Sequence, residues 1–285
     1  MTRRSTFPQM ALASLRSGSR AGHSPKTRAP WRLAAAGLLL GTLVGLVALA
    51  PAQWLADAVD ASTQGRVQLL QPQGRWWSGD AWLRWSAGQG GRDAVVLPDR
   101  LHWQLRPAWL GLDVTLHQPC CMQGDQPLQW RATLAGMSLQ LPTKTWFQGS
   151  AAWLTGLGTP MNTLKPEGLL RLSTQDLRLR WAEGRFQVEG SAEVLLQDLS
   201  SAVSTLDRLG SYQLQLRGGP QGEGELRVLT LSGPLQISAS GQWLNRGGLR
   251  LRGEATAQPG QEAALDNLLN LLGKRQGARA LLSIG

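Results

Sequence analysis

Two of the three histidines and a pair of adjacent cysteines are the residues whose types and spacing could do chemistry. They form the run His117-x-x-Cys120-Cys121, with His102 upstream. Imidazole and thiolate groups are the ligands that zinc prefers, but zinc sites space their cysteines by two to four residues, and no second cluster supplies further ligands. Cysteines with a purely structural role and a disulfide between neighbours are the alternatives. That disulfide would close a strained ring, because neighbouring Cα atoms lie closer than in ordinary bridges.

Motifs of known enzyme classes are not found elsewhere in the sequence. There is no Gly-x-Ser-x-Gly turn for a nucleophilic serine, and Gly273-Lys274-Arg275 lacks the earlier glycine and the hydroxyl of a phosphate-binding loop. His102 lies on the polar side of an alternating segment, as expected for a solvated side chain. The acidic residues are scattered. We therefore predict no catalytic residue, no cofactor-binding residue and no metal ligand, and we expect that the protein is not an enzyme.

An uncharged run, Leu33–Ala50, is the longest apolar segment of the chain. With Pro51 and Ala52 it is long enough, as a helix of roughly 30 Å, to cross a hydrocarbon core. Trp31 and Trp54 flank it, at positions where aromatic rings favour membrane interfaces. The pattern predicts a transmembrane helix over residues 33–52.

Basic residues before this run indicate its direction. Residues 1–32 contain seven lysines and arginines and no acid, which predicts a cytoplasmic N-terminus and an exported remainder. This leader has no apolar period, so we expect it to be disordered. Residues 33–285 carry 22 basic and 19 acidic groups, so the total charge of +10 belongs mostly to the leader. The charge thus favours contact with inner-membrane lipids and gives no indication of nucleic-acid binding.

Cleavage of a signal peptide is the alternative to a retained anchor. Ala50-Pro51-Ala52 before Gln53 has the small-residue form of a cleavage site, but the apolar run is longer than the apolar region of most signal peptides. We favour a single-pass inner-membrane protein with three parts: a cytoplasmic leader over 1–32, the transmembrane helix over 33–52, and a periplasmic domain over 53–285. The oxidising periplasm would favour a disulfide at Cys120 and Cys121.

Alternation of apolar and polar residues predicts that the exported domain is mainly β. The pattern is clear in Leu101–Arg106, Leu177–Trp181, Tyr212–Arg217 and Leu249–Arg252, and segments rich in glycine separate such runs. Period-two alternation gives each strand one dry face, which favours a largely antiparallel sheet built as a meander of hairpins. Tryptophans within these runs are expected in the core, with an aromatic ligand platform at Trp76–Trp85 as the alternative. Arginines on the polar faces are expected to be solvated.

Two segments depart from the β pattern and predict one or two short helices. Gln197–Leu209 has apolar residues at helical spacing. In Gln261–Leu272 the apolar face is clearer, acids lie early, and Gly273 follows as a C-cap. Ala278–Ile284 could return as a last strand.

The order of several segments resembles the type II secretion system protein N family (GspN). Gln73–Ala81 is similar to the Gly-x-x-Trp-x-Gly-x-Ala segment of that family, Leu101–Pro107 to its Trp-x-Leu-x-Pro strand, and Gly233–Trp243 with Leu265–Gly273 to its C-terminal part. Each motif is weak alone, and their order over residues 51–285 carries the resemblance. The long leader and Cys120-Cys121 are departures.

The resemblance implies an accessory inner-membrane component of the type II secretion system, which exports folded periplasmic proteins across the outer membrane of Gram-negative bacteria. It implies other secretion components as partners, no catalytic role and no small-molecule substrate. Exposed strand edges offer a physical route for such docking. A membrane-anchored β-groove that handles lipid is the alternative, if the dry face of the sheet is left uncovered. A periplasmic hydrolase would need a convergent acid pair that the sequence does not reveal.

Overall fold

The computed structural model describes residues 31–88, 93–134, 136–219, 224–243 and 248–284. The chain divides into two compact units, Met1–Ala48 and Leu49–Gly285. Residues 1–30, and with them nearly all of the predicted disordered leader, lie outside the described residues.

The apolar run forms a helix with different bounds from those predicted. Helix α1 is Trp31–Leu49, and a second helix, α2, begins at Ala52 and ends at Ser62. Pro51 separates them, because proline has no N–H to donate to the preceding turn. Ala50 and Ala52 are 4% and 2% exposed and belong to the core of the second unit. Among the residues described, no helix combines the length and the apolarity needed to cross a membrane, so the predicted transmembrane helix over 33–52 is not supported.

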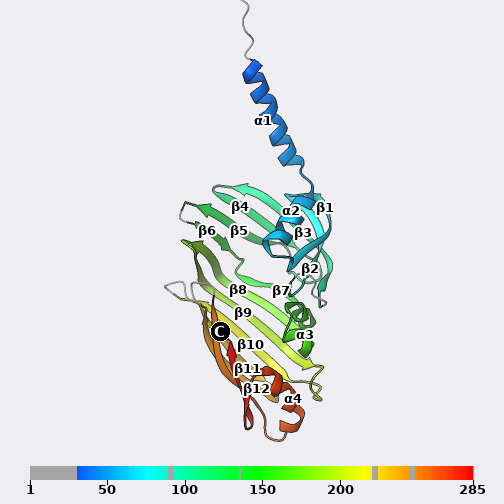
Figure 1. Cartoon of the computed structure of the whole chain (residues 1–285), viewed down its shortest axis with the longest axis vertical. Helices are drawn as coiled ribbons and strands as arrows, with labels where there is room; N and C mark the ends of the chain where they lie inside the picture. The colour runs from blue at the N-terminus through cyan, green and yellow to red at the C-terminus, as the bar shows by residue number, and fades with distance from the viewer. Residues whose placement is uncertain (1–30, 89–92, 135, 220–223, 244–247, 285) are drawn as a thin grey trace, which may run out of the picture. The chain divides into compact units, whose positions relative to one another are not determined.

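The second unit is mainly β, as predicted. Its fifteen described strands form one sheet with antiparallel pairing throughout (Figure 1). The strands are β1 Val67–Arg75, β2 Ser78–Trp85, β3 Val95–Ala108, β4 Gly111–His117, β5 Gln126–Thr133, β6 Gly136–Gln140, β7 Lys144–Ser150, β8 Pro166–Ala182, β9 Arg185–Ser201, β10 Gly210–Gly218, β11 Gly224–Ser232, β12 Leu235–Trp243, β13 Leu249–Ala257, β14 Lys274–Gln276 and β15 Arg279–Ile284.

Nearly every strand pairs with its neighbour in sequence, so the predicted meander is confirmed. The spatial order is β1-β2-β3-β4-β5-β6-β8-β9-β10-β11-β12-β13-β15-β14, with β7 paired to β8 beside β6. The long strand β8 makes this branch possible, because β6 pairs with its C-terminal part and β7 with its N-terminal part. The alternating segments of the sequence lie in β3, β8, β10 and β13.

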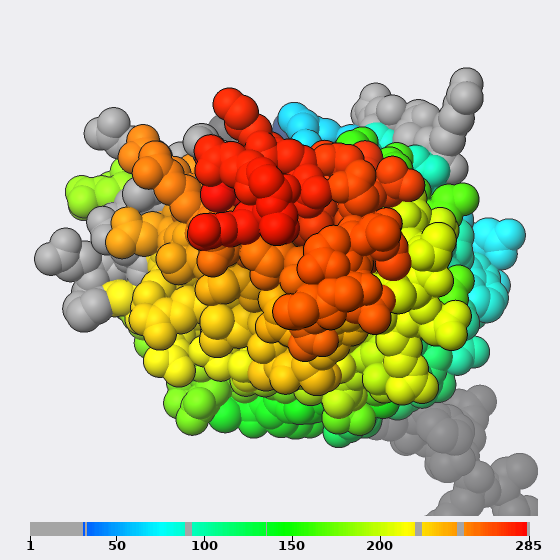
Figure 2. Space-filling model, turned by 90° about the horizontal axis from the view of Figure 1, so that it is seen from below, coloured from blue at the N-terminus to red at the C-terminus, as the bar shows by residue number. Residues whose placement is uncertain are grey.

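The apolar face of the sheet is covered by short helical segments. Helix α2 packs on Ala81 and Trp103 at the N-terminal end of the sheet. At the other end, α3 (Met161–Leu164) and α4 (Glu262–Leu272) contribute Leu164, Leu265, Leu268 and Leu269 to a larger core, and the 3-10 helix η1 (Ala151–Leu157) adds to it. In Figure 2, orange and red C-terminal residues lie over the yellow strands at this end.

The predicted C-terminal helix and last strand are confirmed as α4 and β15. The C-cap at Gly273 is different from the one expected, because its φ is −174° and the residue is extended rather than left-handed. A Cβ at this position would collide with the carbonyl oxygen of Leu281. The glycine therefore permits close approach of β14 to β15, and the basic residues Lys274 and Arg275 continue into a strand.

The predicted helix over Gln197–Leu209 is wrong. Strand β9 continues to Ser201, and the chain then turns back to begin β10 at Gly210. Leu199 and Leu209 are both buried in the larger core, and the Leu209 N–H donates to the Leu199 carbonyl at 2.6 Å. The turn between β9 and β10 thus brings Leu199 and Leu209 into the same core. A helix would have placed them on one face, which is why the spacing suggested one.

The segment after β1 turns tightly, and its glycine meets a buried tryptophan. Gly79 lies opposite Trp103 in the β2–β3 register, and Trp103 is 5% exposed. The Trp103 indole N–H donates to the Trp76 carbonyl at 3.0 Å. A Cβ at Gly79 would lie 2.8 Å from the Trp103 ring and would also collide with the Gln73 carbonyl oxygen. Packing of Trp103 against Gly79 therefore fixes this turn.

We predict that Gly79→Val lowers the free energy of unfolding by about 3 kcal/mol, because the added side chain overpacks this site from two sides. Thermal unfolding and protease resistance measure the effect. A substitution of Arg84, which lies on the same strand, would be a poor control. Arg84 is half-buried and donates a hydrogen bond to the Gln68 side chain at 2.8 Å, so its loss would itself affect stability. Gln129→Val is the matched control, since it places the same residue at an exposed position in β5. Equal stability of the two variants would contradict the packing argument.

Candidate functional site

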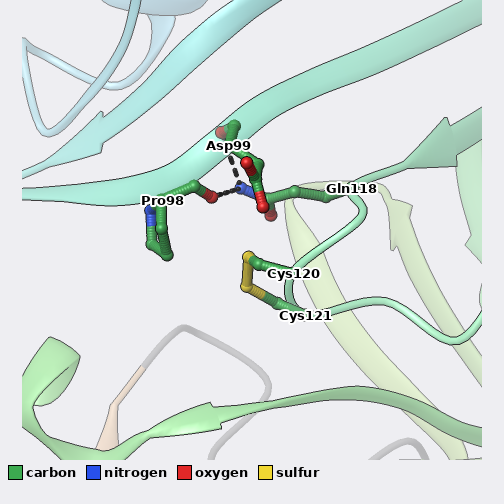
Figure 3. Close-up of a disulfide and its surroundings, with 5 residues drawn as sticks. All are labelled: Pro98, Asp99, Gln118, Cys120 and Cys121. Carbon is green, nitrogen blue, oxygen red and sulfur yellow. Dashed lines mark hydrogen bonds between the residues drawn. A yellow bond between two sulfur atoms is a disulfide. The ribbon is translucent and has the colours of Figure 1, made fainter.

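The adjacent cysteines form a disulfide, one of the three alternatives that the sequence left open. Cys120 and Cys121 are joined with their Cα atoms 3.7 Å apart, and Cys121 is buried (Figure 3). The side-chain amide of Gln118 donates to the carbonyls of Pro98 and Asp99, each at 3.2 Å, and ties the turn to β3. The Gln148 N–H donates to the Cys121 carbonyl at 2.8 Å and joins the turn to β7. The disulfide therefore belongs to a structural turn that links three parts of the sheet.

The two histidines of the exported domain lie on neighbouring strands. His102 and His117 are partners across β3 and β4, with ring centroids 6.2 Å apart, and His102 is exposed as predicted. The His117 Nδ1 lies 3.3 Å from a carboxylate oxygen of Asp125. In the part of the chain that the structure describes, no three His, Cys, Asp or Glu residues gather to hold a metal ion. The oxidised cysteines also offer no thiolate nucleophile.

Tryptophans of the predicted Trp76–Trp85 segment serve packing. The Trp85 indole N–H donates to the Trp153 carbonyl at 2.9 Å, and its ring lies against Gly156 of η1. A second aromatic group, Trp181, Phe186 and Trp243, lies in a row with centroid distances of 5.1 and 5.7 Å. The contact of Trp85 with η1 favours packing over a ligand platform at Trp76–Trp85. Trp181 is 40% exposed and therefore lies outside the core in which it was expected.

Arginines on the polar face are less uniformly solvated than the sequence suggested. Arg106, Arg180, Arg217, Arg250 and Arg252 are exposed, whereas Arg84, Arg131 and Arg178 are half-buried. Glu189 pairs with both Arg178 and Arg180, and Arg131 pairs with Asp113 at 2.6 Å. Exposed pairs of this kind contribute little to stability, so the polar face is a solvated surface with local ion pairs.

The two edges of the sheet differ. Edge strand β1 has a register shift between Leu70 and Gln73, where Gln71 takes a φ of +49° and Pro72 cannot donate a hydrogen bond. Such irregularity blunts an edge against pairing. At the opposite edge, β14 covers only Arg279–Leu281 of β15. No described strand pairs with the outer side of residues 282–284, so the end of β15 offers free backbone groups to a partner strand.

An apolar pocket lies between the sheet and its covering helices at the C-terminal end. Its volume is about 210 Å³, and nearly all of the surface that lines it is carbon. The lining residues come from η1, α3, α4, their connections and five consecutive strands: Leu154, Met161, Leu164, Pro166, Leu196, Leu199, Ser200, Ser201, Leu209, Tyr212, Leu214, Val228, Leu235, Ile237, Leu268 and Leu272.

Hydroxyl groups in the wall of this pocket are engaged by the backbone. The Tyr212 hydroxyl lies 3.0 Å from the Leu209 carbonyl and 3.1 Å from the Leu235 carbonyl, to which it donates. The Ser201 hydroxyl donates to the Leu164 carbonyl at 2.5 Å. Burial raises the pKa of Tyr212 well above its ordinary value, because a phenolate would lose its hydration there. The wall therefore offers a ligand apolar contact and no free charge.

The pocket is larger than the voids that packed protein cores usually contain. The pocket is partly open to solvent, and its wall leaves an apolar surface that a ligand could cover. Natural cores contain few voids of this kind, and apolar ones do not hold water stably. The pocket is thus the strongest candidate for a binding site in the described residues. Its walls come from segments far apart in the chain, so the dry face of the strands is its only signal in the sequence.

Comparison with known proteins identifies one family. The family model described as type II secretion system (T2SS), protein N, matches residues 65–282. Neither curated proteins nor solved structures give a significant match to this chain. The match covers the whole sheet apart from the last two residues of β15, and it includes the tryptophan-rich turn and the pocket.

We predict that Tyr212 does not ionise in the folded protein near the ordinary tyrosine pKa of about 10. It is the only tyrosine of the chain, so tyrosinate absorbance reports on this residue alone. The raised pKa means that its contribution to stability is complete below about pH 10 and is lost as pH rises through the folded-state value. Tyr212→Phe should remove this loss and lower stability at neutral pH by about 1 kcal/mol. Ionisation near pH 10 without unfolding would contradict the burial.

Proposed function

The chain belongs to the type II secretion system protein N family, and we propose that it supports the export of folded periplasmic proteins across the outer membrane. In this role it is a non-catalytic accessory component that binds other parts of the secretion machine. The single observation that carries the proposal is the family match over residues 65–282. The cysteines support a non-catalytic role, because they are joined to each other. The carboxylate beside His117, that of Asp125, is exposed to solvent, which also favours a surface ion pair over an acid–base site.

Association with the inner membrane forms part of this proposal. The basic residues of the leader favour the anionic cytoplasmic lipid surface, and apolar side chains of α1 such as Leu38, Leu39 and Leu43 are exposed in their own unit. Contact with inner-membrane lipid would cover these side chains. A periplasmic location of the β domain is a separate part of the proposal, and the Cys120–Cys121 disulfide supports it because that compartment is oxidising.

Docking on another secretion component is proposed to use the end of β15. An unpaired strand end can accept a partner strand through main-chain hydrogen bonds, and the irregular edge at β1 is less suited to this. Leu282 and Ser283 border the free part of the edge, and Ser283 is exposed. The partner contributes a strand and needs no pocket or metal at this place.

We predict that deletion of the protein abolishes or strongly reduces secretion of a substrate exoprotein. A variant in which His102, His117, Cys120 and Cys121 are all replaced should restore secretion as wild type does, provided that its abundance in membranes is normal. Export of the exoprotein and the amount of folded protein are measured together. Normal secretion after deletion would contradict the accessory role. Lost secretion with a normally folded variant would instead indicate chemistry at these four residues.

We predict that a photo-crosslinking amino acid at Ser283 captures the periplasmic part of a type II secretion component in intact cells. The same amino acid at Gln129, which is exposed in the middle of the sheet, is the matched control and should capture none. Mass spectrometry identifies the captured peptide. Equal capture at both positions would contradict docking at β15, and capture of cytoplasmic proteins would contradict both the docking and the periplasmic location.

A further inference from the structure

We propose that the apolar pocket between the sheet and helices α3 and α4 binds one acyl chain of a fatty acid or lipid. The inference rests on the pocket alone and holds whether or not the chain takes part in secretion. The pocket lies against five consecutive strands, β8 to β12, and is bordered on the other side by residues of η1, α3 and α4.

Chemistry of the wall defines the class of ligand. The two hydroxyls described above, on Tyr212 and Ser201, are already engaged by backbone carbonyls. Nearly all of the lining surface is carbon, so a charged or polar group of a ligand would lose its hydration there with almost no replacement. The part that enters must be apolar, and any polar headgroup must remain outside.

Size and shape favour a chain over a ring. A cavity of about 150 Å³ holds the six carbons of benzene, so by proportion 210 Å³ holds roughly eight carbons. The strands along the wall cover roughly 19 Å at the usual separation between neighbours. Except for Tyr212 and Pro166, the large side chains of the wall are flexible aliphatic residues and Met161, which adapt to an unbranched chain. A helix or strand of a partner protein is too wide for this volume.

Some residues of the pocket wall are only half-buried, so a ligand can enter beside them. They are also suitable positions for substitutions that test the proposal. Leu214 and Val228 face each other across β10 and β11 and are less buried than Tyr212 or Leu268. A larger side chain at Leu214 would occupy the pocket without disturbing the buried tyrosine. Leu229, one residue beyond Val228, is exposed on the opposite face of β11 and gives a matched control.

The test uses the full chain in a detergent-free amphipathic polymer, with decanoate carrying a photoreactive group at its chain end as the probe. We expect labelling of pocket residues, with adducts at Met161 or Leu268 found by mass spectrometry. Leu214→Trp should reduce this labelling by about tenfold or more, and Leu229→Trp should leave it unchanged. Labelling that is equal in all three proteins, or that falls only on α1, would overturn the proposal.

Competition and stability complete the test. Unlabelled decanoate and vesicles of phosphatidylethanolamine and phosphatidylglycerol are added separately as competitors. Competition by decanoate alone identifies a free fatty acid as ligand, and competition by vesicles identifies a membrane lipid; failure of both would overturn the proposal. Decanoate should also raise the melting temperature of wild type and of Leu229→Trp but not of a folded Leu214→Trp. If Leu214→Trp does not fold, a melting temperature of wild type that is unchanged by decanoate would overturn the proposal.

Discussion

Covering the apolar face of one continuous sheet is the constraint on which the rest of this structure depends. Fifteen described strands pair into one continuous sheet, and each alternating strand turns one row of apolar side chains to the same side. Only a few short helical segments lie over that side. Where α2 packs on Ala81 and Trp103 the cover is tight, because alanine and glycine let the elements approach closely. Where α3 and α4 lie over strands β8 to β12, a pocket is left between the helices and the sheet.

The sequence predicted those parts of the fold that depend on local pattern. Alternation in Leu101–Arg106 and Leu249–Arg252 is a property of the strand itself, and the acid-first, apolar-faced segment before Gly273 forms a helix by its own period. The failure at Gln197–Leu209 has a non-local cause, since pairing of β9 with β8 extends the strand through Leu199 to Ser201. Leu199 and Leu209 still reach the larger core, but a turn brings them there instead of a helix.

Most features of the candidate sites could not be predicted from local sequence patterns. The packing of Trp103 on Gly79 depends on the β2–β3 register, which the local sequence pattern does not define. The state of Cys120 and Cys121 was left open, because spacing alone does not distinguish a free pair from a disulfide. The boundary at Pro51 was missed because Ala50 and Ala52 extend an apolar run in the sequence, although they are buried in the β domain. Pocket residues from Leu154 to Leu272 become neighbours only after the meander has formed.

The unequal edges of the sheet limit how this protein can assemble. Growth of an open-ended fibre by strand addition needs two competent edges on every molecule, one to give and one to receive. Here the bulge at Gln71 and Pro72 disables one of them, while the end of β15 remains open. Strand addition at one edge alone does not propagate from molecule to molecule. The irregular β1 edge therefore opposes the growth of this long sheet into a polymer.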